Sequence, residues 1–131
     1  MVSADDKIIT AVKLSGGECH DGPEGRNVLL ANGKVNIRIP LLMDRAYEGD
    51  ETRALAESLG YLPVVPPKKN RKEPWQYDKE LYKKRNVIER LFRRIKAFRR
   101  IFTRYDKLDV IYLGFVYFCF CAIWLISVNR P

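Results

Sequence analysis

An uncharged apolar run near the C-terminus constrains this 131-residue chain more than any other feature. The run VIYLGFVYFCFCAIWLISV, residues 110–128, contains no charged residue and approaches the roughly 20 residues that cross a bilayer. Length and hydropathy do not separate a membrane span from a helix buried in a soluble core. The run therefore predicts either a buried C-terminal helix over 109–128 or a membrane anchor.

Composition narrows the class of protein. With 47% hydrophobic residues the chain is not wholly disordered, and 31% charged residues exclude a polytopic membrane protein. Three cysteines, Cys19, Cys119 and Cys121, form no CxxC pair, so neither a disulfide framework nor a zinc ribbon is indicated. Charged residues from Asp5 to Lys7 interrupt any early apolar run, so no signal peptide is expected. These features favour one domain in the cytoplasm.

The basic charge is concentrated in one block. Residues 1–67 carry 7 basic and 10 acidic residues, whereas residues 68–107 carry 16 basic and 5 acidic residues. A block of this density predicts a polyanionic partner. Nucleic acid and an anionic membrane surface both fit.

The first third of the chain predicts a strand and a helix. Lys7–Leu14, KIITAVKL, is β-branched and follows a turn at Asp5 and Asp6, which is typical of a strand. Pro23 suits the start of a short helix that Gly33 ends.

A strand–helix–strand unit is predicted next. Ile37–Met43 is a short apolar strand, a helix begins at Asp50 or Glu51 and ends at Gly60, and residues 62–65 supply a second strand. Such a crossover joins parallel strands and places Asp44 at the carboxyl edge of the sheet, where α/β folds usually hold their sites.

A basic loop over residues 67–78 contains KKNRKEPWQY. Its cations, Lys68, Lys69, Arg71 and Lys72, predict contacts with a phosphate backbone, and Trp75 predicts stacking on an unpaired base. The alternative is an ordinary solvated surface loop.

One long helix is predicted over residues 78–102, with Asp78 as N-cap. When each residue is advanced by 100° around the helix axis, the side chains of this helix fall on three faces. The apolar face predicts the core and contains Leu81, Ile88, Leu91, Phe92, Ile95, Phe98 and Phe102. An opposite basic face contains Lys83, Arg90, Arg93, Arg94 and Arg100. Between them lies a strip of Tyr82, Arg85, Glu89 and Lys96, which suits a phosphodiester site or, alternatively, a plain Arg85–Glu89 surface ion pair.

Two acids could serve phosphoryl transfer. Cleavage of a phosphodiester commonly uses two divalent ions held by carboxylates from different elements. Asp44 at a strand end and Glu89 on a helix are suitable donors, and magnesium prefers such oxygen ligands. Ordinary surface acids remain the alternative interpretation.

The residues also resemble a known family. The run from Tyr82 to Lys96 matches Y-x2-R-x3-E-x6-K, the signature of bacterial insertion-sequence transposases of the DDE type. LLMDRAY around Asp44 resembles the second-aspartate motif of that family, and LSGGECHD, VVPPKKNRKEP, YDKELYKKR and FRRIFTRYDKL fit the same family in the same order. The resemblance covers nearly the whole chain.

The resemblance implies an α/β, partial RNase H-like fold, a mixed sheet with flanking helices. It implies that Asp44 and Glu89 are the second and third catalytic acids and hold Mg²⁺ or Mn²⁺. Tyr82, Arg85 and Lys96, with the basic loop and with Arg93 and Arg94, would contact double-stranded DNA at terminal inverted repeats. The His20–Asp21 pair matches a recurrent family dipeptide that serves as structural support as readily as catalysis.

The resemblance also implies an incomplete site. The first catalytic aspartate of the family lies on a strand upstream of the motifs found here, so we expect a truncated or split-frame transposase that is inactive alone. Its partners would be an N-terminal transposase half and, by analogy, a second copy. The resemblance favours the buried helix over the anchor. A small tail-anchored protein with a basic cytoplasmic segment, which the positive-inside rule would permit, is the alternative.

Overall fold

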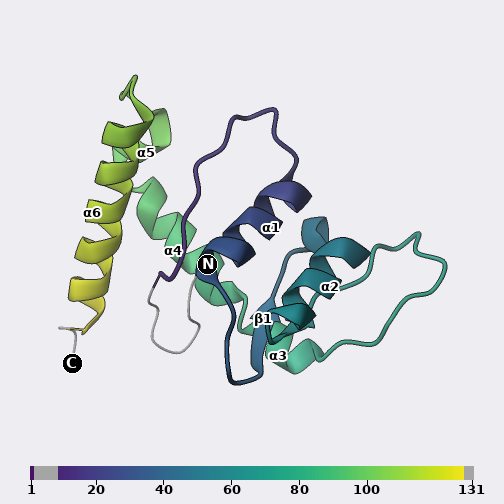
Figure 1. The fold of residues 1–131 in the computed structure, drawn as a ribbon. Helices are drawn as coiled ribbons and strands as arrows, with labels where there is room; N and C mark the ends of the chain where they lie inside the picture. Colours follow the sequence, from purple (N-terminus) through teal and green to yellow (C-terminus); the bar gives the residue numbers. More distant parts are fainter. Residues whose placement is uncertain (2–8, 129–131) are drawn as a thin grey trace. The chain divides into compact units, whose positions relative to one another are not determined.

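The structure, a computed structural model, describes Met1 and residues 9–128, apart from the side chain of Val128 (Figure 1). The chain divides into two compact units, which we describe separately. The sheet unit is Ala11–Arg85, and the helical unit is Met1–Thr10 together with Asn86–Pro131. The turn predicted at Asp5 and Asp6 lies outside the described residues.

The strand predicted over 7–14 is not formed in its described part. Ile9 makes an isolated β-bridge and residues 10–16 are irregular, while residues 7 and 8 lie outside the described residues. The sequence pattern was too short to decide this, because a strand needs a neighbour that satisfies its backbone groups.

Helix α1, Asp21–Asn32, matches the predicted helix and its predicted end. Gly33 has φ of 80°, and its N–H donates to the carbonyls of Leu29 and Leu30 at 3.1 and 3.2 Å. Glycine adopts this backbone conformation without the cost that a Cβ would add, so the helix ends there.

The predicted parallel unit is confirmed. Strand β1, Ile39–Leu42, leads through the 3₁₀ helix η1, Arg45–Tyr47, and helix α2, Asp50–Ser58, into strand β2, Tyr61–Val64. The strands pair in parallel, with Ile39 opposite Tyr61 and Leu42 opposite Val64. Among the described residues the sheet has these two strands, so the expected mixed sheet is not observed.

The core of the sheet unit lies where α2 packs on β2 and where α1 packs on α2 and η1. Its buried apolar side chains come from both strands and both helices: Leu29, Leu41, Met43, Ala56, Tyr61, Val64 and Val65. The Tyr61 hydroxyl, almost fully buried, accepts a 2.6 Å hydrogen bond from Asn32 Nδ2, which ties β2 to the end of α1.

The prediction of a single long helix over residues 78–102 is wrong. The structure contains α3, Lys79–Lys83, in the sheet unit, and α4, Asn86–Lys96, and α5, Arg99–Thr103, in the helical unit. At the interruptions the backbone bonds are i to i−3, from Arg85 N to Tyr82 O at 3.0 Å and from Phe98 N to Ile95 O at 3.0 Å. Neither interruption has a proline or glycine, so periodicity alone could not locate them.

The predicted N-cap of this region is confirmed. Asp78 Oδ1 accepts from the backbone N–H of Leu81 at 2.9 Å, which satisfies one of the free amide groups at the start of α3.

The apolar C-terminal run forms one helix, α6, Asp109–Val128 (Figure 1). It is not the buried helix that we expected. It contacts α4 and α5 in its own unit, and its inward side chains Val116, Cys119 and Ile123 are buried with Ile95. Only 17% of the apolar stretch within Asp109–Ser127 is buried. Two short helices offer too little apolar surface to cover a helix that is apolar on every side.

Candidate active site

Asp44 lies directly after β1, as predicted. The backbone N–H of Met43 donates to Val64 O at 3.0 Å and extends the ladder by one bond beyond the strand. Asp44 is then the extended N-cap residue of η1, and its carbonyl accepts from Tyr47 N at 2.9 Å. Its side chain does not cap η1 and is half exposed, so the carboxylate is presented at the carboxyl edge of the sheet.

The carboxylate of Asp44 pairs with Arg85. Arg85 Nη2 donates to Asp44 Oδ2 at 2.6 Å, in the range of strong charge-assisted hydrogen bonds. Arg85 lies in the turn that follows α3. The short helix, which Asp78 caps, therefore sets the position of the Arg85 backbone. The pair joins the motif LLMDRAY, which contains Asp44, to the motif Y-x2-R-x3-E-x6-K, which contains Arg85.

Tyr82 stands beside this pair. Burial raises the pKa of the Tyr82 hydroxyl; Arg85 opposes this shift and Asp44 adds to it. Tyr82 also makes an edge-on ring contact with Tyr77, with centroids 5.6 Å apart. The structure therefore gathers Asp44, Tyr82 and Arg85 within the sheet unit.

Tyr47 is a neighbour of Asp44 that the sequence analysis did not single out. Burial raises the pKa of its hydroxyl, and the negative charges of Asp21 and Asp44 raise it further. Its ring packs so closely on α1 that a Cβ at Gly25 would lie 2.5 Å from Cε1 of Tyr47. The sequence feature that could have identified Tyr47 as a site residue is its position three residues after Asp44 in LLMDRAY. Asp21, at the start of α1, and Asp44 therefore both lie close enough to Tyr47 to affect the pKa of its hydroxyl.

The remaining predicted site residues lie on α4, in the helical unit. Glu89 is in the first turn, where the helix dipole favours an acid, and Arg93, Arg94 and Lys96 are in the last turn, where it favours cations. All four are exposed, and Arg94 Nη1 donates to Ser127 Oγ on α6 at 3.3 Å. Glu89 and Lys96 are seven residues apart on one helix and therefore share a face.

The described residues do not form a metal site by themselves. No three His, Cys, Asp or Glu side chains gather closely enough within the described part of the chain to hold an ion. Asp44 has a guanidinium on one of its oxygens. A divalent cation needs more oxygen donors than this one carboxylate offers, so Asp44 does not hold Mg²⁺ or Mn²⁺ on its own.

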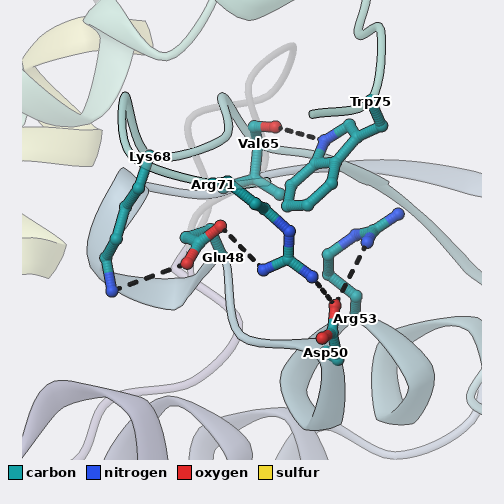
Figure 2. Close-up of polar contacts among 7 residues, drawn as sticks. All are labelled: Glu48, Asp50, Arg53, Val65, Lys68, Arg71 and Trp75. Atoms are coloured by element: carbon teal, nitrogen blue, oxygen red, sulfur yellow. Dashed lines mark hydrogen bonds and ion pairs between the residues drawn. The ribbon is translucent and has the colours of Figure 1, made fainter. Parts of the chain in front are cut away.

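The predicted DNA-contacting loop contains side chains with partners in the protein, of which Figure 2 shows Arg71 and Trp75, and exposed side chains. Arg71 and Trp75 have partners within the protein: Arg71 Nη1 donates to Glu48 Oε2 at 3.1 Å, and Trp75 Nε1 donates to Val65 O at 2.9 Å. Lys69 and Lys72 are exposed and have no ion-pair partner among the described residues. Lys68 lies between these cases, with 55% of its side chain exposed and its Nζ 3.5 Å from Glu48 Oε1.

Helix α6 meets the length and composition of a membrane span. Among the described residues, the window Asp109–Ser127 has a mean hydropathy of 2.2 and is long enough to cross a bilayer. Core helices of soluble proteins can meet the same criteria.

Comparison with known proteins identifies the family. The model of the transposase DDE domain matches residues 41–126, a segment that includes Asp44, Glu89 and nearly all of α6. A Brucella ovis protein named as a transposase for insertion sequence element IS6501 is 30% identical over 115 residues, which cover 87% of this chain and 86% of that relative. No solved structure matches significantly. The chain therefore belongs to the transposase DDE-domain family.

Proposed function

We propose that this chain acts in DNA transposition as the C-terminal portion, residues 1–131, of an RNase H-like DDE catalytic domain. The observation that carries the proposal is the 2.6 Å pair between Arg85 and Asp44, because it brings one residue from each of the two family motifs to the carboxyl edge of a parallel sheet. The reaction would cleave a phosphodiester at the end of an insertion sequence and transfer the freed strand to a target.

The proposed roles follow from the chemistry of each group. Asp44 and Glu89 are the acids that would hold divalent cations, magnesium or manganese, whose charge stabilises a phosphoryl-transfer transition state. Arg85 supplies a planar donor that fits two phosphate oxygens, and Lys96 supplies a point charge. Tyr82 would pack against the DNA.

Because the family resemblance implies a further catalytic aspartate beyond Asp44 and Glu89, we propose that another polypeptide supplies this remaining carboxylate. An N-terminal transposase half, carrying a strand that ends in aspartate, is the expected partner. The chain alone would then bind DNA without cutting it. By analogy, two copies of the chain would be needed to hold two DNA ends. Transposition would take place in the cytoplasm.

The test is a cleavage assay on duplex DNA that carries the terminal inverted repeats. We expect no specific nicks from the chain with Mg²⁺ alone, and specific nicks once the polypeptide encoded immediately upstream is added. Asp44→Asn and Glu89→Gln should each abolish cleavage. Glu57→Gln is the matched control, since Glu57 is an exposed acid on α2. Cleavage that survives both active-site substitutions would contradict the proposal.

A tail-anchored membrane protein is the second candidate, and the low burial of α6 favours it. The family match argues against it, because the matched segment runs to residue 126 and so treats most of α6 as part of the domain. Resistance of the expressed protein to carbonate extraction, with a protected C-terminus, would favour the anchor.

A further inference from the structure

A buried carboxylate fixes the start of the basic loop, residues 67–78. Glu48 is only 5% exposed although it carries a charge, and such an acid is tolerated in a protein when cations satisfy it. Arg71 Nη1 lies 3.1 Å from Glu48 Oε2, and Lys68 Nζ lies 3.5 Å from Glu48 Oε1 (Figure 2). A turn closed by Arg71 N and Lys68 O at 3.1 Å connects these two cations.

The second guanidinium nitrogen of Arg71 anchors the loop to α2. Arg71 Nη2 pairs with Asp50 Oδ1, and Arg53 Nη1 lies 3.6 Å from the same oxygen (Figure 2). Both terminal nitrogens of Arg71 are therefore committed to acids of this unit. A phosphate could bind them only by displacing Glu48 or Asp50.

Trp75 closes the other end of the loop. Its indole N–H donates to Val65 O at 2.9 Å, just after β2. The guanidinium carbons of Arg53 and Arg71 lie 3.7 and 4.6 Å from the ring centroid, close enough for cation–π contact. Two guanidinium groups of the protein therefore already lie against the ring on which an unpaired base was predicted to stack.

Three lysines are left at the surface of this anchored loop. Lys69 and Lys72 are exposed and have no described ion-pair partner, and Lys68 makes one ion pair at 3.5 Å. Glu73, also exposed, is the acid within the same loop. Lysines present flexible point charges, which suit phosphates and carry no information about base sequence.

We infer that the basic loop, residues 67–78, is a preformed platform for the backbone of duplex DNA, in which Lys68, Lys69 and Lys72 contact phosphates. Arg71 and Trp75 are positioning residues that act through the loop and do not touch the DNA. This inference rests on the proposed function, and it replaces the idea that Trp75 stacks on a single-stranded base. It also separates the role of Arg71 from that of the neighbouring lysines.

Binding of the full chain to a labelled duplex, titrated with salt, tests the contacts. Each phosphate contact contributes about 0.9 to the slope of log K against log salt. We expect Lys69→Gln with Lys72→Gln to reduce the slope by about 1.8. The control is Lys34→Gln with Arg38→Gln, which removes the same charge from exposed positions outside the basic block and should leave the slope unchanged.

The positioning role is tested by Trp75→Phe, which keeps an aromatic ring and loses the bond to Val65 O. We expect the variant to bind the duplex more weakly at every salt concentration, with an unchanged slope of log K against log salt. Trypsin should cleave faster at Lys69 and Lys72, while the urea midpoint stays unchanged. In a Trp124→Phe background, single-stranded DNA should not quench Trp75 fluorescence.

The outcomes separate the two proposals. An unchanged slope in the lysine variant, or strong quenching of Trp75 by single-stranded DNA, would overturn this inference and leave the proposed function standing. If the unaltered chain binds phosphatidylserine vesicles and no DNA, the DNA partner of the proposed function fails and this inference fails with it.

Discussion

Arg85 Nη2 donates to Asp44 Oδ2 across 2.6 Å, although 41 residues separate the two in the chain. Asp44 owes its position to the end of β1, and Arg85 owes its position to the turn after the capped helix α3. The guanidinium balances the charge of an acid that the family resemblance assigns to catalysis. A DNA phosphate that competes for Arg85 would free that oxygen of Asp44.

Arg85→Ala should separate function from stability. Because half of the Asp44 side chain is exposed, the pair should contribute less than about 1 kcal/mol to the free energy of unfolding. A guanidinium bound to phosphate is worth more, so cleavage in the assay supplemented with the upstream polypeptide should fall by about tenfold or more. Arg38→Ala, at an exposed arginine of the same unit, should change neither quantity. A large drop in the urea midpoint of Arg85→Ala would instead assign the pair to folding.

Gly25→Ala should be destabilising by about 1–3 kcal/mol, because the new Cβ would lie 2.5 Å from the Tyr47 ring and force it to move. Gly22→Ala is the matched control on the same helix, since its nearest neighbour would be Arg26 Nη1 at 3.9 Å. It should be neutral or stabilising by up to about 1 kcal/mol. Urea unfolding followed by circular dichroism measures both, and equal effects would contradict the packing of Tyr47 on α1.

Gly60→Ala should cost more than Gly33→Ala. Both glycines have positive φ, 90° and 80°, so both substitutions carry backbone strain of about 1–2 kcal/mol. At residue 60 the Cβ would also lie 2.5 Å from the backbone carbonyl of Val35, which cannot rotate away as a side chain does, whereas residue 33 has open space. If thermal unfolding midpoints rank the two variants in the opposite order, the close approach of Val35 to the start of β2 is wrong.

Asp106 should make the helical unit acid-sensitive. Arg100 donates two hydrogen bonds to it, at 2.9 and 2.6 Å, and these hold the pKa of the Asp106 carboxyl below its ordinary value of 3.8. The stabilisation is present above the ordinary pKa and is lost as the pH falls through the lowered value. Asp106→Asn should therefore show a smaller loss of urea midpoint between neutral and strongly acidic pH than the unaltered chain. Glu57→Gln, which removes an exposed acid with no described ion-pair partner, should follow the unaltered chain.

The amino-acid sequence by itself determined several local elements of this protein. The parallel strand–helix–strand unit, the end of α1 at Gly33, the N-cap at Asp78 and the position of Asp44 after β1 were all predictable. Each depends on interactions between residues a few positions apart, or on the alternation of apolar and polar residues. Such signals are present in a short window of sequence.

The tertiary structure alone decided how distant segments meet. It divided the predicted helix 78–102 into three, joined Arg85 to Asp44, and enclosed Arg71 and Trp75 among Glu48, Asp50 and Arg53. A cation or aromatic ring in a basic loop looks the same in sequence whether it faces DNA or a buried acid. The choice depends on whether a partner carboxylate is brought within a few ångströms, and only the folded chain determines that distance.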